Sequence, residues 1–178
     1  MMINKIIKKM LNDKISDLHT ALPAKIEKID LQKMRAEITL LNQKELEDEL
    51  VTIPPIVEVP VSYYRANNMI IRPPYQKGDT VLVIFAEKAL DKLMITGQPE
   101  DPELTRRHSI DDAIIVGGLQ MEQHDDLPAD FKEQMVIGLL NGSEFDSWIR
   151  IDPATKEIEL KIDEETWLHI KEGRAELK

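Results

Sequence analysis

The segments Ser147-Trp148-Ile149-Arg150-Ile151 and Thr166-Trp167-Leu168-His169-Ile170 nearly repeat each other, and Glu157-Ile158-Glu159-Leu160-Lys161-Ile162 lies between them. Each segment alternates apolar and polar residues, which is the pattern of a half-buried β-strand. Turn sequences such as Asp152-Pro153-Ala154-Thr155 separate the segments. The pattern predicts one aliphatic face, formed by Ile149, Ile151, Ile158, Leu160, Ile162, Leu168 and Ile170. The other face carries Arg150, Glu157, Glu159, Lys161 and His169, together with Trp148 and Trp167.

The aliphatic face of these strands must be buried against another protein surface. Residues 141–178 are too few to bury it alone, because units below roughly 40 residues rarely hold a core unaided. Short stacked strands are well covered by identical copies of themselves. We therefore expect a symmetric oligomer with a rod-like C-terminal end.

Composition and net charge exclude several kinds of site and classes of partner. The chain has 178 residues, no cysteine, 4% aromatic residues and a formal net charge of −10. Disulfides, thiolate zinc sites and cysteine nucleophiles are therefore excluded, and the negative charge argues against nucleic-acid binding. No apolar run approaches the roughly 18 residues that span a bilayer, and no secretory signal is recognisable, so we expect synthesis in the cytoplasm of the host.

Residues 1–20 are expected to form an amphipathic helix. Apolar residues recur at helical spacing in Ile3, Ile6, Ile7, Met10, Leu11, Ile15 and Leu18, and lysines lie mostly off that face. The helix would end before Pro23. Packing within an oligomer or docking onto a partner protein is preferred over membrane binding, because the aromatic anchors usual at membranes are missing.

Residues 21–119 are expected to form a small β-barrel. Strands are predicted at 24–29, 34–40, 56–61, 69–71, 80–85 and 110–116, the last stopped by Gly117-Gly118. The first two form a hairpin with a turn at 30–33. Strands of this number and length, without regular helices between them, favour an OB-type barrel. Residues 120–140 are expected to be a linker, and Asn141-Gly142 a hairpin turn that opens a β-region at 141–178.

Two runs in the barrel region carry a resemblance to a known family. The first is Tyr75-Gln76-Lys77-Gly78-Asp79-Thr80-Val81-Leu82-Val83-Ile84-Phe85, and the second is Arg106-Arg107-His108-Ser109-Ile110-Asp111-Asp112-Ala113. In combination they resemble the N-terminal OB-fold domain of the membrane-puncturing central spike proteins of contractile phage tails. The resemblance covers roughly residues 18–118, and the C-terminal strands match that family by architecture alone.

The resemblance implies an all-β fold and a role in the virion. Such spikes are homotrimers, with OB domains as a collar on the tail hub or baseplate and an intertwined trimeric β-helix or β-prism that points at the host cell envelope. Spikes of this family often close their tip with a His-x-His pair that binds iron. This sequence contains no His-x-His, and His169 stands alone, so the tip is expected to be metal-free or capped by another protein.

Two polar clusters contain residue types that occur in functional sites. His108, Ser109, Asp111 and Asp112 contain the residue types of a hydrolytic triad, but neighbours in sequence point in different directions and do not converge on one carbonyl. Capping by Ser109 or Asp111 and ion pairs of Arg106 or Arg107 are expected instead. Glu122, His124, Asp125 and Asp126 lack the spacing of a calcium or zinc site, so a solvated acidic loop is expected there.

The sequence therefore predicts a non-enzymatic protein without catalytic, cofactor or metal residues. Trp148 and Trp167 suggest either packing over neighbouring chains, which is favoured, or stacking of a carbohydrate or partner. We expect a structural spike at the baseplate tip of a phage or phage-like contractile tail, which pierces the envelope mechanically. The alternative is an OB-fold binding module for nucleic acid or carbohydrate.

Overall fold

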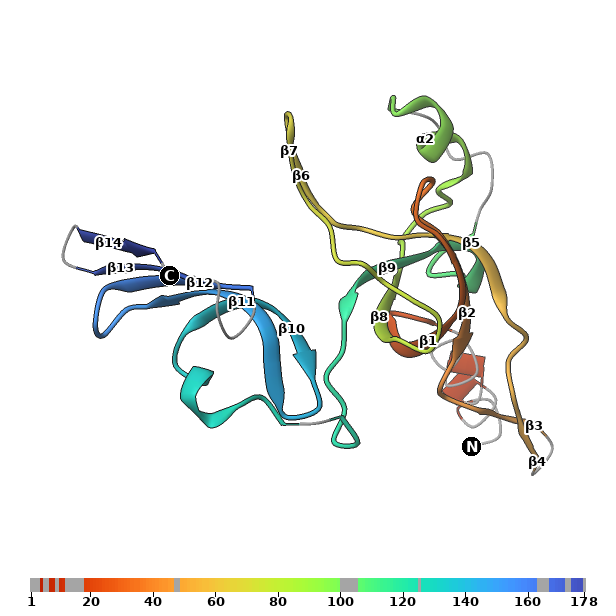
Figure 1. Ribbon diagram of the computed structural model, residues 1–178. Coiled ribbons are helices and arrows are strands. Elements are labelled where there is room, and N and C mark those ends of the chain that lie inside the picture. Colours follow the sequence, from red (N-terminus) through yellow and green to blue (C-terminus); the bar gives the residue numbers. More distant parts are fainter. Residues whose placement is uncertain are drawn as a thin grey trace. The chain divides into compact units, whose positions relative to one another are not determined.

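The computed structural model describes residues 4, 7–8, 10–11, 18–46, 49–99, 106–124, 126–162, 167–171 and 174–177. Compact packing divides the chain into two units, Met1–Gln120 and Met121–Lys178. Each unit is built mainly of β-strands (Figure 1). Among the described residues no helix is long and apolar enough to cross a membrane.

The first unit is built on a five-stranded antiparallel sheet with the order β5-β2-β1-β8-β9. These strands are β1 (Ala21–Asp30), β2 (Arg35–Leu40), β5 (Ile56–Pro60), β8 (Thr80–Phe85) and β9 (Ala113–Gly118). The two edge strands meet where Val61 forms a parallel bridge with Ile115, and the Ser62 amide donates to the Ile115 carbonyl at 2.8 Å. The sheet therefore curls into a partly closed barrel, which confirms part of the expected architecture.

The barrel interior is aliphatic, as the low aromatic content predicts. Every second residue of β2 is buried, because successive side chains of a strand point to opposite faces. The buried core consists of Ala24, Ile26, Met34, Ala36, Ile38, Leu40, Val59, Val61, Tyr75, Val81, Val83, Phe85, Ala113 and Ile115. The predicted hairpin turn is confirmed as well: Asp30 Oδ1 accepts hydrogen bonds from the amides of Gln32 and Lys33.

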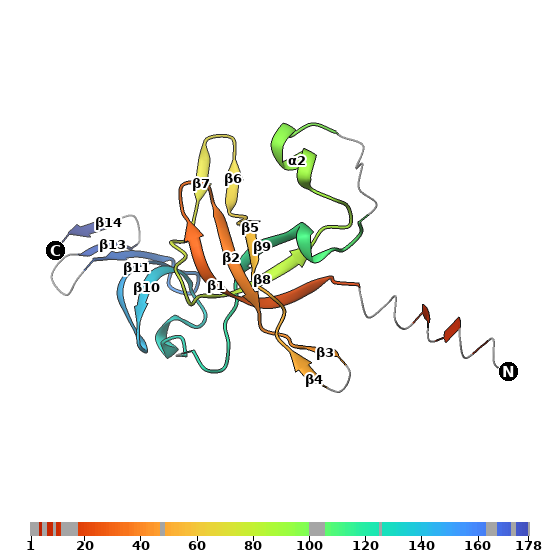
Figure 2. The same ribbon diagram turned by 90° about the vertical axis from the view of Figure 1, so that its right-hand side faces the viewer.

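Two small hairpins and one short helix leave the barrel. The hairpins are β3 (Lys44–Leu46) with β4 (Glu49–Val51) and β6 (Tyr64–Ala66) with β7 (Met69–Ile71), and both extend away from the five-stranded sheet (Figure 2). Helix α2 (Asp91–Thr96) lies between β8 and β9 and ends at Gly97, whose φ of 64° suits glycine. No regular helix was predicted between the strands of this region, so α2 corrects that prediction.

The last barrel strand differs from its prediction. Residues Ile110–Asp112, predicted as the start of a strand, form the 3₁₀ turn η1, and β9 continues through Gly117 and Gly118 instead of stopping before them. Both glycines pair with β8, opposite Leu82 and Val81. The turn forms because Ser109 caps it, accepting a hydrogen bond from the Asp111 amide.

The expected N-terminal helix of residues 1–20 falls mostly outside the described residues, and Asn4, Ile7, Lys8, Met10 and Leu11, which are described, have helical backbone. Four of its described apolar side chains are exposed: Ile7, Met10, Leu11 and Leu18. Its packing within an oligomer or onto a partner stays a prediction.

The second unit is a five-stranded antiparallel sheet in chain order, β10-β11-β12-β13-β14. Its strands are β10 (Met135–Asn141), β11 (Glu144–Asp152), β12 (Glu157–Lys161), β13 (Trp167–Lys171) and β14 (Arg174–Leu177). The three strands expected from the sequence are therefore confirmed, with β10 added before them and β14 after them. Strand β10 lies at the end of the segment 120–140 that was expected as a linker, and the short 3₁₀ turn η2 (Ala129–Phe131) precedes it.

Cross-strand register confirms the two predicted faces of this sheet. Ile149 pairs with Leu160 and Leu160 with Leu168, whereas Arg150 pairs with Glu159 and Glu159 with His169. Directly opposite residues in antiparallel strands share a face. The aliphatic residues therefore lie on one side and the polar residues with both tryptophans on the other.

Candidate functional site

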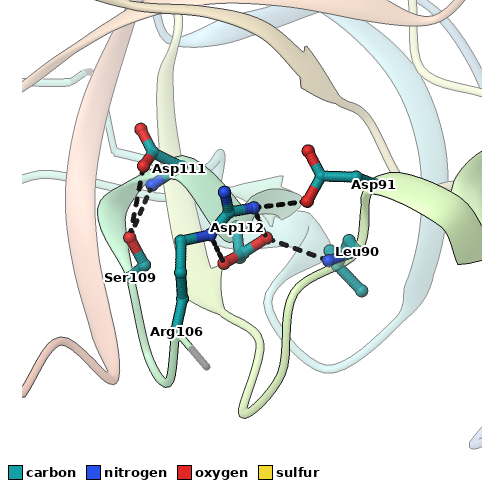
Figure 3. A network of polar contacts seen from close by, with 6 residues as sticks. All are labelled: Leu90, Asp91, Arg106, Ser109, Asp111 and Asp112. Atoms are coloured by element: carbon teal, nitrogen blue, oxygen red, sulfur yellow. Dashed lines mark hydrogen bonds and ion pairs between the residues drawn. The ribbon is translucent and has the colours of Figure 1, made fainter. Parts of the chain in front are cut away.

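A buried ion pair fixes the run of residues 106–113 in the first unit, which carries part of the family resemblance. Both carboxylate oxygens of Asp112 accept hydrogen bonds from Arg106, at 2.9 Å from Nε and 2.9 Å from Nη2 (Figure 3). Asp112 also accepts a hydrogen bond from the Leu90 amide at 2.9 Å, and Arg106 donates to Asp91 at the start of α2. One carboxylate thus joins η1, the loop before it and the start of α2.

Electrostatics favour the charged forms of this pair. The Asp112 side chain is only 1% exposed, and burial by itself would raise the pKa of its carboxyl. The hydrogen bonds from Arg106 and the Leu90 amide outweigh that effect, so the pKa of Asp112 lies below its usual value. In return, the hydrogen bonds with Asp112 raise the pKa of the Arg106 guanidinium. The arrangement is that of a structural clamp.

The four residues that contain the residue types of a hydrolytic triad do not form one. Ser109 Oγ lies 3.5 Å from Asp111 Oδ2 and serves as the cap of η1, and Asp112 faces Arg106. His108 has a φ of 47°, its amide donates to the Ala86 carbonyl, and no described hydrogen bond joins its ring to Ser109. The capping by Ser109 and the ion pairs of Arg106 and Arg107, the latter with Glu87 at 3.4 Å, agree with the expectation.

The acidic loop considered as a cation site is engaged in a turn of its own. His124 Nδ1 accepts a hydrogen bond from the Met121 amide at 3.1 Å. Glu122, His124 and Asp126 are exposed, and Asp125 lies outside the described residues. Among the residues that the structure describes in this loop, no three carboxylate or histidine groups lie close enough to share one ion.

The aliphatic face of the second unit is largely uncovered. Exposed fractions of its side chains are 54% for Ile137, 61% for Leu139 and 42% for Ile149. The register extends this face from β10 to β13, through Met135, Ile137, Leu139, Ile149, Ile151, Ile158, Leu160, Leu168 and Ile170. An exposed apolar surface of this extent is typical of an interaction site.

The opposite face carries an aromatic cluster at one end. Phe131 of η2 packs edge-on against Phe145 and Trp148, with ring centroids 4.9 and 5.3 Å apart. The Lys161 ammonium lies 4.7 Å from the Trp148 ring centroid, a favourable cation–π distance. Trp148 thus packs on its own chain, whereas the expected contact with neighbouring chains stays a prediction.

A charged network occupies the middle of the same face. Arg150 Nε lies 2.6 Å from Glu159 Oε2, and Lys171 pairs with Glu157. His169 Nε2 lies 3.4 Å from Glu157 Oε2 and 3.7 Å from Glu159 Oε1. The hydrogen bond from Lys171 and its positive charge hold the pKa of Glu157 below its usual value.

Sequence reasoning placed Glu157, Glu159 and His169 on one face but did not group them as a site. Alternation along a strand indicates which side chains share a face, and the Glu157-x-Glu159 spacing is visible in the sequence. The pairing of Glu159 with His169 depends on the register between β12 and β13, which the loop sequence between them does not specify.

A comparison with protein families finds one match. A family model described as phage protein Gp138 N-terminal domain matches residues 22–118, which are most of the first unit. No curated protein matches the chain. The matched segment contains the five barrel strands and the Arg106–Asp112 clamp, and its description indicates no catalytic family.

Proposed function

Because this chain belongs to the family of phage proteins with the Gp138 N-terminal domain, we propose that it is the central spike of a contractile phage tail. It is a phage protein associated with the virion. In the proposal the first unit is an OB-type collar that seats on the tail hub or baseplate, and the second unit is the piercing end. Its action is mechanical and needs no catalytic residue.

The topology of the first unit supports the OB-type assignment. An OB-fold is a five-stranded, partly open Greek-key barrel. Here the outer strands β5 and β9 approach in parallel at Val61 and Ile115, while every other contact between neighbouring strands of the sheet is antiparallel. Such a barrel leaves few free strand edges, which suits a collar that must resist pairing with other chains.

The uncovered aliphatic face of the second unit is the observation that carries the proposal. Met135, Ile137 and Leu139 are each at least 54% exposed. Three copies that turn these faces toward a common axis would bury them and leave the charged faces outside. A rod held together in this way is stiff, because its core is continuous and its strand edges can pair between chains.

The test is the solution mass of the full chain. We expect light scattering to give a mass near three times 20.5 kDa, and we expect the trimer band to persist in SDS without boiling if the strands interlock. A monomer at micromolar concentration would contradict the spike and favour a binding module on the same barrel.

A further inference from the structure

The charged network on the second unit has the ligand set of a cation site. One nitrogen and two oxygens, from His169, Glu157 and Glu159, all lie within 4.8 Å of one another. The three side chains come from the adjacent strands β12 and β13: Glu159 pairs directly with His169, and Glu157 lies two residues before Glu159 on the same face. They are mostly shielded, with exposed fractions of 13% for Glu157, 24% for Glu159 and 21% for His169.

Each glutamate presents one free oxygen to the histidine. Lys171 holds Oε1 of Glu157, and Arg150 holds Oε2 of Glu159 at 2.6 Å. The remaining oxygens, Oε2 of Glu157 and Oε1 of Glu159, are the two that face His169 Nε2, at 3.4 and 3.7 Å. In protein metal sites, groups outside the ligands form hydrogen bonds to them and fix their orientation before the ion binds. Lys171 and Arg150 would have this role here.

The histidine nitrogen is poorly satisfied without an ion. His169 Nε2 is shielded from solvent and forms no hydrogen bond of standard geometry among the described residues. A buried polar atom without a partner is costly, and the nearest acceptors are longer than normal hydrogen bonds. A coordinated ion would satisfy this nitrogen and both free oxygens at once.

We propose that Glu157, Glu159 and His169 bind one divalent transition-metal ion, with Zn²⁺ as the best fit. Zinc accepts mixed nitrogen and carboxylate ligands at about 2.0–2.2 Å in tetrahedral geometry, which places ligand atoms roughly 3.3 Å apart. The two nitrogen–oxygen distances of 3.4 and 3.7 Å are close to this separation, and the two glutamate oxygens, which lie within 4.8 Å of each other, would move together around the ion. Ca²⁺ and Mg²⁺ are disfavoured because they prefer sites made of oxygen alone. Three protein ligands leave the fourth position to water.

The site would link β12 to β13 on the face opposite the aliphatic surface. Binding to the folded state alone stabilises that state in proportion to the logarithm of ion concentration over Kd. The ion would therefore stiffen the end of the molecule that has the smallest core of its own. This inference does not depend on the trimer, because all three ligands belong to one chain.

Co²⁺ is a suitable probe, because a tetrahedral cobalt site has strong visible absorption. The full chain is stripped with a chelator and titrated with CoCl₂, and zinc is added afterwards as a competitor. We expect saturable absorption at one Co²⁺ per chain, displaced by an equivalent of Zn²⁺. We also expect His169→Gln and Glu159→Gln each to weaken binding at least about tenfold, as loss of a ligand does.

His124→Gln is the matched control, because His124 belongs to the exposed acidic loop that is the competing cation candidate. It should leave the titration unchanged. The proposal is overturned if the unaltered chain shows no saturable cobalt spectrum, or if His124→Gln removes it while His169→Gln does not. Tryptophan fluorescence and circular dichroism check that the His169 and Glu159 variants are folded; should either be unfolded, its place is taken by Glu157→Gln with the same expectation.

Discussion

Asp112 is the only buried charged side chain among the described residues. Its position is tolerated because Arg106 donates two hydrogen bonds and the Leu90 amide a third. The sequence predicted a strand at 110–116, and nothing in the spacing of this run marks which carboxylate is buried. The ion pair of Arg106 and the cap formed by Ser109 were predictable from the sequence, whereas the identity of Asp112 as the partner of Arg106 was not.

Asp112→Asn should destabilise the first unit by about 3 kcal/mol, because it leaves the Arg106 guanidinium without its buried counter-charge. Amide hydrogen exchange of β8 and β9 measures this, with protection expected to fall by about two orders of magnitude. The exposed neighbour Asp111 offers a matched control, and Asp111→Asn should change stability by less than about 0.5 kcal/mol. Equal effects of the two substitutions would show that the clamp contributes nothing.

The loss of folding stability caused by Asp112→Asn should be smaller at acidic pH. Because the pKa of Asp112 is lowered in the folded protein, its carboxylate contributes stability above the usual value of about 4, and that contribution disappears as the pH falls through the folded pKa. The free energies of unfolding of the unaltered chain and of Asp112→Asn are measured by urea unfolding, followed by circular dichroism, at pH 7 and near pH 3. A difference that stays constant over this range would argue against the ion pair as its source.

At the scale of elements, strand β10 depends on one glycine. The Asn141-Gly142 turn predicted a hairpin that opens the C-terminal β-region, and β10 and β11 confirm it. The sequence did not show why Gly138 stands in the middle of a strand, where glycine is normally unfavourable. The structure supplies the reason: a Cβ at this position would lie 2.8 Å from the Phe145 ring and 2.8 Å from the Ser147 carbonyl oxygen.

Gly138→Ala should therefore destabilise the second unit by roughly 1–3 kcal/mol, the usual cost of forcing an atom into a packed site. Both tryptophans of the chain lie in this unit, so urea unfolding followed by tryptophan fluorescence reports on it directly. Gly117→Ala on β9 is the control, since a Cβ there meets nothing within 4 Å, and its unfolding is followed by circular dichroism. An unchanged midpoint in the Gly138 variant would mean that the Phe145 ring moves aside freely.

At the scale of the whole molecule, the two faces of the second sheet have different roles. On the charged face, Arg150 and Lys171 pair with glutamates of the same chain. The aliphatic face has no such cover, and Ile149 in its middle is 42% exposed. In the proposed spike, assembly of three chains would bury this aliphatic face.

Ile149→Lys should convert the trimer to a monomer, because three lysines would be brought together at the centre of the proposed interface without counter-charges. Asp146→Lys is the control: it adds positive charge on the same strand at an exposed residue outside the aliphatic face. Light scattering of both variants measures the outcome. A trimer that survives Ile149→Lys but not Asp146→Lys would place the interface elsewhere.

The sequence by itself determined the features that depend on local geometry. The two-residue period of a strand assigned side chains to faces. Asp30 and Asp152 marked turns, because a short carboxylate can accept hydrogen bonds from the amides two and three residues further along the chain. Only the tertiary structure decided which distant groups meet. The burial of Asp112, the curl that brings Val61 to Ile115, and the convergence of His169 on two glutamates all depend on strand register and sheet curvature, which arise from packing across the whole unit.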